Sequence, residues 1–147
     1  MTSKTDVVKA WLAEPVSDEK ARMAYIAEDF QNVDRDGNVV MDKAAWVGMS
    51  RLMLTSFEGY DYKASEVREE GDAVIMTGRF EGTHTADLDL SAMGVGVIPA
   101  SGKRIVWPAW STKVTVEGDK ITRMEPYGEG GGMEAFLAAL DVTPPSE

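Results

Sequence analysis

The sequence contains no cysteine and only one histidine, His84. Without cysteine, the chain can form no disulfide, hold no zinc through thiolates and use no cysteine nucleophile. It also lacks an apolar run of membrane-spanning length, and its first residues show no cleavage pattern of a secretory signal. These absences predict a soluble, cytoplasmic protein that does not bind a membrane.

Basic residues are few compared with acidic ones. The 15 Lys and Arg are scattered among 25 Asp and Glu, and the formal net charge is −10. Nucleic-acid binding requires clustered positive charge against the phosphates, so we expect no nucleic-acid partner. A chain of 147 residues is long enough to bury a proper core, and we expect one domain over residues 1–147.

The first third of the sequence has the periodicity of helices. Apolar residues within 7–12 fall on one helical stripe, with Thr5 and Asp6 as candidate N-caps. After Pro15, a second helix is predicted from Ser17 to about residue 27. These two segments should form the start of a helical layer.

A third and stronger helix is expected after Asp42, which can cap it. Its inward stripe, at spacings of three, four and four, consists of Trp46, Met49, Met53 and Phe57. Packing in a core is the simpler interpretation of such a stripe. Because Met adapts to irregular shapes, the same stripe can also line an apolar cavity.

The segment "NVDRDGNVVMDK" at 32–43 resembles the first half of a calcium-binding loop. The bidentate glutamate that such a loop needs at its twelfth position is absent, since Lys43 stands there. Asp and Gly supply turn geometry, so the segment predicts a turn between two short extended pieces. We expect no metal site here.

From Tyr60 onward the pattern changes to strands. Two long hairpins are predicted, with turns at 70–72 and 117–119. A flexible connector at 128–132 and a short final helix at 133–140 follow. Helices first and an antiparallel sheet afterwards predict an α+β fold, in which a curved antiparallel sheet packs on the N-terminal helices.

Alternation along 74–84 separates the two faces of one predicted strand. The less polar set, expected to face the concave interior, contains Val74, Met76, Gly78, Phe80, Gly82 and His84. Histidine ordinarily changes charge near neutral pH and can act as base or acid. Contact with a substrate, a single hydrogen bond that closes the sheet, and exposure to solvent all stay open for His84. The two glycines indicate kinks in a bent sheet.

Two tryptophans three residues apart cannot both face inward from a regular strand. By parity Trp110 joins Val106 and Val114 on the apolar side, and it is the better candidate for a pocket. Trp107 would then face a helix or a partner molecule. Pro108, between them, can alter this through a bulge.

Several motifs resemble those of the SnoaL-like polyketide cyclases, in the nuclear transport factor 2-like superfamily. They are "GTHT" at 82–85, "IP" at 98–99 with "SGK" at 101–103, and "GDKI" at 118–121. The similarity covers roughly residues 5–145. It implies a cone-shaped sheet with an internal apolar pocket, a homodimer formed through the sheet, and no metal or cofactor. It also implies an acidic residue in the pocket for acid–base catalysis of an aldol closure.

The residues and the resemblance together predict a site for a small apolar carbonyl compound. His84 is the predicted proton carrier, with Asp29 orienting it or acting itself; Glu125 and Glu129 are the other carboxylates that can enter the pocket. The predicted substrate-binding residues are Tyr25, Trp46, Met49, Met53, Phe80, Trp110 and Met124. Three functions are consistent with this site: a cyclase or isomerase, a non-catalytic binding protein, and a dimeric adaptor with a filled interior.

Overall fold

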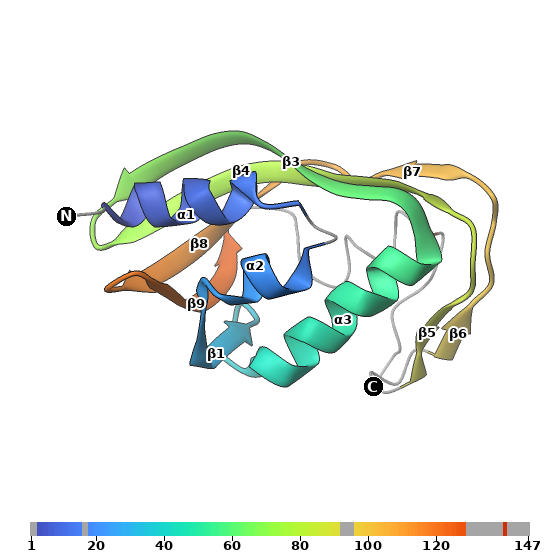
Figure 1. The fold of residues 1–147 in the computed structure, drawn as a ribbon, viewed down its shortest axis with the longest axis horizontal. Coiled ribbons are helices and arrows are strands. Elements are labelled where there is room, and N and C mark those ends of the chain that lie inside the picture. The colour runs from blue at the N-terminus through green and yellow to red at the C-terminus, as the bar shows by residue number, and fades with distance from the viewer. Residues whose placement is uncertain (1–2, 16–17, 92–95, 129–139, 141–147) are drawn as a thin grey trace.

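A strongly curved sheet wraps around helices in the computed structural model, which describes residues 3–15, 18–91, 96–128 and 140 (Figure 1). The helices are α1 (Lys4–Ala13), α2 (Glu19–Met23) and α3 (Lys43–Ser56). The strands are β1 (Ile26–Val33), β2 (Val39–Asp42), β3 (Phe57–Glu70), β4 (Ala73–His84), β5 (Leu88–Leu90), β6 (Gly96–Ile98), β7 (Arg104–Val106), β8 (Trp110–Glu117) and β9 (Lys120–Tyr127). No helix in these ranges is both long and apolar enough to cross a membrane.

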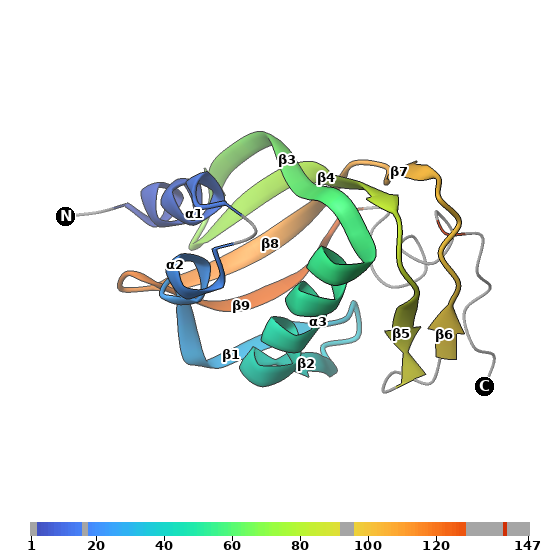
Figure 2. The ribbon, with the colours of Figure 1, turned by 45° about the vertical axis from the view of Figure 1, so that its right-hand side comes forward.

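The large sheet has the strand order β2-β1-β9-β8-β4-β3, with β7 also pairing with β4. Strands β5 and β6 form a separate two-stranded sheet at one end (Figure 2). Both predicted hairpins are confirmed as β3–β4 and β8–β9, whose turns contain Gly71 and Gly118 at positive φ. The α+β cone is confirmed, although one pair, β1 with β9, is parallel. The predicted C-terminal helix at 133–140 lies outside the described residues, apart from Leu140.

The second helix is shorter than predicted, because it ends at Met23 and a strand begins at Ile26. Three extra residues bulge from β1: Ile26 pairs with Ile121 and Gln31 with Arg123. The bulge buries Ile26 and Phe30 at a spacing of four. The strand therefore begins at Ile26, inside the segment predicted to be helical to about residue 27.

Helices α1 and α3 each begin after a residue whose side chain caps the first turn. Ser3, rather than Thr5 or Asp6, is the N-cap of α1: its hydroxyl accepts from the Asp6 N–H at 3.0 Å and the Asp6 carboxylate accepts from the Ser3 N–H at 3.4 Å. Asp42 is the N-cap of α3, as predicted, because its Oδ1 accepts from the Ala45 N–H at 2.9 Å. This cap fixes where α3 leaves β2.

Asp42→Ala is expected to lower the free energy of unfolding by about 1 kcal/mol, because the first turn of α3 loses its hydrogen-bond acceptor. Urea unfolding followed by circular dichroism measures the change. Asp36→Ala, in the exposed turn before β2, removes the same charge without removing a cap and serves as the control. A loss as large in Asp36→Ala would show that charge, and not capping, is the cause.

Two apolar clusters fill the space between the helices and the concave face of the sheet. The first contains Val7, Val8, Trp11, Ile26, Phe30, Val74, Met76, Val114, Val116, Ile121 and Met124. The second contains Met53, Phe57, Leu88, Leu90, Ile98 and Trp107. The predicted alternation of β4 is confirmed from Met76 to His84, where Met76 and His84 are buried and Arg79 is exposed, but Ile75, on the opposite face, is also buried. His84 therefore lies on the inner face.

Val106 was predicted to face inward and Trp107 to face a helix or a partner molecule; the structure contradicts the first and agrees with the helix, because the cluster around Trp107 includes Met53 of α3. The side chain of Trp107 is fully buried in the second cluster, whereas Val106 remains 49% exposed. The chain leaves the β conformation between β7 and β8, around Pro108, so the alternation does not continue across this break. The backbone N–H of Trp107 instead donates to the Phe80 carbonyl at 2.9 Å, which turns the indole inward.

Gly78 allows a close approach on the inner face, as its predicted role in bending the sheet requires. A Cβ added there would lie 2.5 Å from the Lys63 carbonyl oxygen and 2.7 Å from the Tyr62 hydroxyl. Because the first of these atoms belongs to the backbone of the neighbouring strand, the space cannot be opened by moving a side chain. Tyr62 can therefore lie flat over β4 only where β4 has a glycine.

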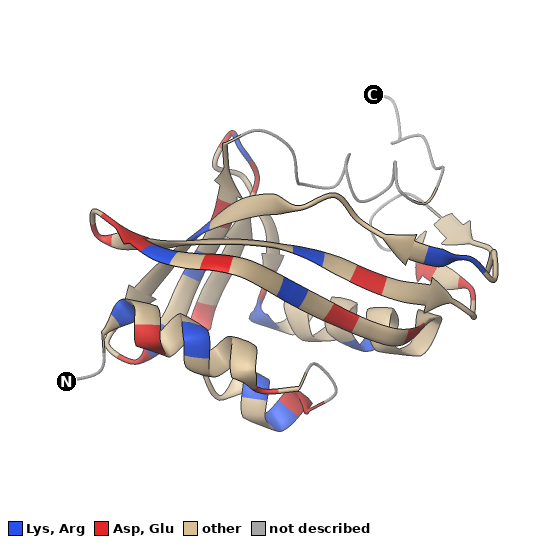
Figure 3. Cartoon of the chain, turned by 90° about the horizontal axis from the view of Figure 1, so that it is seen from above, with Lys and Arg blue, Asp and Glu red and all other residues tan. Residues whose placement is uncertain are grey.

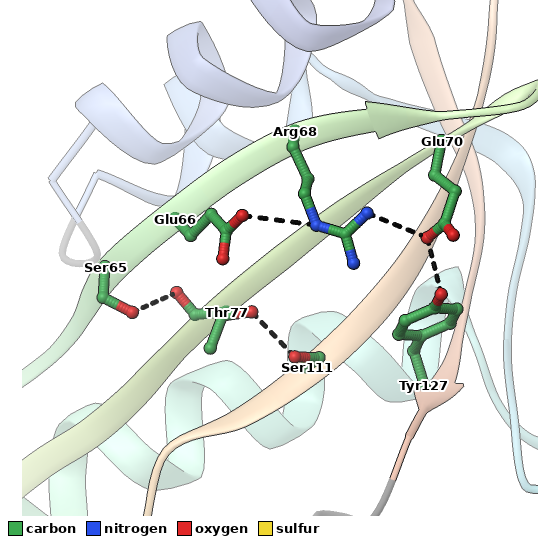
Figure 4. A network of polar contacts seen from close by, with 7 residues as sticks. All are labelled: Ser65, Glu66, Arg68, Glu70, Thr77, Ser111 and Tyr127. Carbon is green, nitrogen blue, oxygen red and sulfur yellow. Dashed lines mark hydrogen bonds and ion pairs between the residues drawn. The ribbon is translucent and has the colours of Figure 1, made fainter.

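Charged residues recur along the long strands of the large sheet (Figure 3). Arg68 pairs with Glu66 at 3.2 Å and with Glu70 at 3.0 Å, and the Tyr127 hydroxyl donates to Glu70 at 2.6 Å (Figure 4). The Thr77 and Ser111 hydroxyls are 2.7 Å apart on the same face. The inner face is therefore the face suited to an apolar compound.

Candidate functional site

His84 is the last residue of β4 and is only 1% exposed. Its ring stacks on that of Phe57, the first residue of β3, with centroids 4.7 Å apart and planes 16° from parallel. The two residues meet because the β3–β4 register places them opposite each other. Strand pairing thus determines which aromatic ring holds the imidazole.

The backbone at His84 is fixed from two sides. Its N–H donates to the Lys103 carbonyl at 2.9 Å, and its carbonyl accepts from the Gly102 N–H at 2.8 Å. On the other side, the N–H groups of Thr85 and Ala86 donate to the Ser56 carbonyl at the end of α3. The imidazole therefore has little freedom to move away from its position.

A small cavity of about 50 Å³ lies beside His84. It is lined by His84, Ile98, Pro99, Ser101, Lys103, Ile105 and Leu140. The His84 Nε2 atom is buried and has no hydrogen-bond partner among the described residues. An unpaired buried polar atom costs about 1–3 kcal/mol, so the site is suited to a polar group from outside the protein. The cavity holds one such group, but not a whole ligand of about 300 Å³ or more.

The structure does not bring Asp29 to His84. Asp29 is exposed on β1, and strands β9 and β8 lie between β1 and β4. The bulge in β1, which the sequence pattern did not reveal, moves this residue away from a helix end. Glu125 is also directed elsewhere, because it pairs with Arg123 at 2.8 Å and Lys113 at 3.7 Å. Glu129 lies outside the described residues.

The predicted substrate-binding residues all belong to the interior, but they divide between the two clusters. Tyr25, Trp46 and Met124 belong to the first cluster or pack against it. Met49, Met53, Phe80 and Trp110 belong to or pack against the second. Met53 and Met124 are buried and the other five are half-buried. None of the seven is in the lining of the cavity beside His84.

Half-buried aromatic rings surround Phe80 on the inner face of β3, β4 and β8. Tyr60 stacks on it at 5.7 Å, and Tyr62 and Trp110 contact it at 4.8 Å and 5.9 Å. Burial raises the pKa of Tyr62 to about 12 and also raises the pKa of Tyr60, so both phenols stay protonated near neutral pH. The two tyrosines were missed, although the alternation of "YDY" at 60–62 could have placed both on one face.

Arg22, at the end of α2, is another interior residue that the sequence did not predict. It is 9% exposed, and its guanidinium carbon lies 4.6 Å from the centroid of the Trp11 ring. Its Nη1 donates to the Glu14 carbonyl at 2.8 Å. Burial lowers the pKa of Arg22, yet a guanidinium remains charged in proteins. A positive charge is therefore held inside the cone.

Comparison with known proteins gives matches over most of the chain. Residues 8–124 match the sequence profile of the SnoaL-like domain. An NTF2-like protein of Burkholderia thailandensis is similar in structure, with 21% identity, coverage of 98% of this chain and 100% of that chain, and a TM-score of 0.67. A candidate SnoaL-like polyketide cyclase of a Jannaschia species is also similar in structure. It has 16% identity, coverage of 96% of this chain and 93% of that chain, and a TM-score of 0.70.

A third similar structure is a protein of Catenulispora acidiphila with a ketosteroid isomerase-like fold, in complex with trimethylamine. It has 17% identity, coverage of 97% of this chain and 100% of that chain, and a TM-score of 0.64. At such low identities these structures establish the fold alone. Among curated proteins no match was found.

Proposed function

The chain belongs to the SnoaL-like domain family, and on that premise we propose that it is a cofactor-independent enzyme that moves a proton within a small carbonyl compound, as a cyclase or isomerase does. His84 is the proton carrier. The observation that carries the proposal is the buried, unpaired Nε2 of His84 beside a small cavity. A positioned base beside a bound carbonyl compound speeds proton transfer from the carbon next to the carbonyl.

The proposed reaction begins with a neutral imidazole whose Nε2 lone pair is free. Nε2 takes a proton from the carbon next to the ligand's carbonyl, and the electron pair of that C–H bond forms an enolate. In an isomerisation, the imidazolium returns the proton to another carbon of the same conjugated system. In a cyclisation, the enolate carbon attacks a second carbonyl of the molecule, and the resulting alkoxide takes the proton from the imidazolium. Neither route consumes an oxidant or a co-reactant.

Two residues in the cavity lining carry donors that fit the developing oxyanion. Ser101 supplies a hydroxyl and Lys103 an ammonium group. Donors held in place at the position where negative charge develops lower the barrier to enolate formation. The backbone bonds between 102–103 and His84 keep this loop and the imidazole together.

His84→Gln is expected to lower the rate of proton exchange by at least about 100-fold, since removing a positioned general base costs that much or more. The measurement is deuterium incorporation next to the carbonyl of 4-phenylbutan-2-one in D₂O, followed by NMR. Asp119→Asn, in the exposed β8–β9 turn, changes a polar side chain outside the site and is the control. Equal exchange rates in wild type and His84→Gln would contradict the assignment of His84.

A non-catalytic binding protein is the second candidate. The observation in its favour is that no described carboxylate bonds to His84 Nε2, so no acid among these residues orients the imidazole through that atom. The same experiment separates the two candidates. Binding of the ketone without faster deuterium exchange would favour the binding protein.

A further inference from the structure

The cavity beside His84 has a buried inner end and an exposed rim. His84 and Ile98, which are 1% and 7% exposed, line the inner end. Pro99, Ser101 and Lys103 line the same cavity and are exposed, so they form the rim. A ligand therefore enters past this rim, and the part of the ligand that enters first is the part that meets the imidazole.

The volume of the cavity limits which part of a ligand enters. The cavity measures about 50 Å³. Since one water-sized group needs about 10–15 Å³, this volume has room for roughly four such groups. An acetyl end, with its methyl group, carbonyl carbon and oxygen, fits into this space. The branched end of an isopropyl ketone does not fit unless the walls of the cavity move.

Hydrogen bonds hold the wall that the loop 99–103 contributes. The Ala100 N–H donates to the Asp87 carboxylate at 2.9 Å. The Gly102 N–H donates to the His84 carbonyl at 2.8 Å, and the Lys103 carbonyl accepts from the His84 N–H at 2.9 Å. The loop is thus attached both to the end of β4 and to the segment that follows it, and it cannot move outward without breaking these bonds.

Strand pairing holds the other two walls, which are isoleucines. Ile98 pairs with Leu88 in the sheet of β5 and β6, and Ile105 on β7 pairs with Gly82 on β4. An isoleucine side chain is branched at Cβ and has few rotamers, so it does not swing aside as a longer flexible side chain does. The cavity therefore keeps its size when a ligand arrives.

We propose that the substrate is a ketone with a short, unbranched acyl end, such as a methyl ketone, and that Ile98 and Ile105 set this limit. The acyl end lies against His84, and the remainder of the molecule stays at the rim or beyond it. This inference rests on the proposed function and adds to it the class of substrate and the residues that select it. Nε2 then takes its proton from the inserted methyl group, whose C–H electron pair forms the enolate.

The test compares 4-phenylbutan-2-one with 4-methyl-1-phenylpentan-3-one, in which an isopropyl group replaces the methyl group. Deuterium incorporation in D₂O is followed by NMR with the full chain, and each rate is divided by the rate that free imidazole gives with the same ketone. We expect this ratio to be at least about 10-fold higher for the methyl ketone, because even one extra methylene group has an effect of that size in a fitted pocket. Within the methyl ketone, we expect the protein to favour exchange at the methyl group over the methylene group more strongly than free imidazole does.

Ile105→Ala widens the cavity and is expected to raise the ratio for the isopropyl ketone by at least about 10-fold. Val106→Ala is the matched control, because the next side chain along β7 is 49% exposed and lies outside the cavity lining. Ile98→Ala tests the other wall, with Val97→Ala, at a side chain that is 53% exposed, as its control. If a widened variant does not fold, the comparison of the two ketones on wild type still decides.

Binding is followed separately through the ring signals of His84, the one histidine in the sequence. Equal exchange ratios for the two ketones overturn the size limit and leave the proposed function standing. An unchanged preference in folded Ile98→Ala and Ile105→Ala overturns the role of these two walls. A His84 shift with the methyl ketone alone, without exchange, supports the size limit and contradicts the proposed function. Neither shift nor exchange with either ketone overturns both.

Discussion

Trp107→Ala is expected to lower the free energy of unfolding by about 3–5 kcal/mol, the cost of removing a large buried aromatic side chain. The indole is fully buried, and its ring meets Phe57 at 5.3 Å in an edge-to-face contact. Its removal would leave a cavity under the ring on which His84 stacks. Urea unfolding, followed by circular dichroism and analysed as a two-state transition, measures the loss.

Val106→Ala is the matched control, one residue earlier on the same segment. Its side chain is half exposed, so the expected change is within about 0.5 kcal/mol. A large loss of stability in Val106→Ala together with a small one in Trp107→Ala would contradict this placement. It would indicate that Val106 faces inward and Trp107 does not. Similar losses in both variants would show that the segment has no preferred face.

His84→Phe is expected to raise the free energy of unfolding by about 1–3 kcal/mol while abolishing deuterium exchange into the ketone. The substitution removes a buried polar atom that has no partner and keeps an aromatic ring over Phe57. The adjacent cavity of about 50 Å³ can take up the added volume. Thermal and urea unfolding measure stability, and NMR in D₂O measures exchange.

His84→Gln is the companion variant, because it retains a polar group at the same position and should show no comparable gain. If His84→Phe is less stable than wild type, the imidazole makes an interaction that stabilises the fold. That result would contradict the description of Nε2 as a buried atom without a partner. A stabilised variant without exchange activity would instead indicate a residue retained for function at a cost to stability.

The sequence predicted the fold well where a local signal and the tertiary structure agree. Asp42 was identified as a cap because an acceptor before an apolar helical stripe has one common use. The turns at Gly71 and Gly118 require positive φ, which glycine adopts readily, so both hairpins were found. The face of His84 followed from alternation along one uninterrupted strand.

The remaining features depend on contacts between distant segments. Pairing of β1 with β9 converts the predicted end of the second helix into a bulged strand and places Asp29 on the surface. Arg22 lies over Trp11 only because α2 folds back beside α1. No local pattern marks either event. Alternation predicts a face of one element, but it cannot show which elements meet.

The long edge strand β3 has a consequence for how copies of this chain can associate. An unpaired edge invites strand addition by a second molecule, which leads to aggregation unless something opposes it. Charged side chains follow one another along β3, with acidic ones in excess: Glu58, Asp61, Lys63, Glu66, Arg68, Glu69 and Glu70. Two such edges placed side by side would bring like charges together. Self-assembly by sheet extension at β3 is therefore disfavoured.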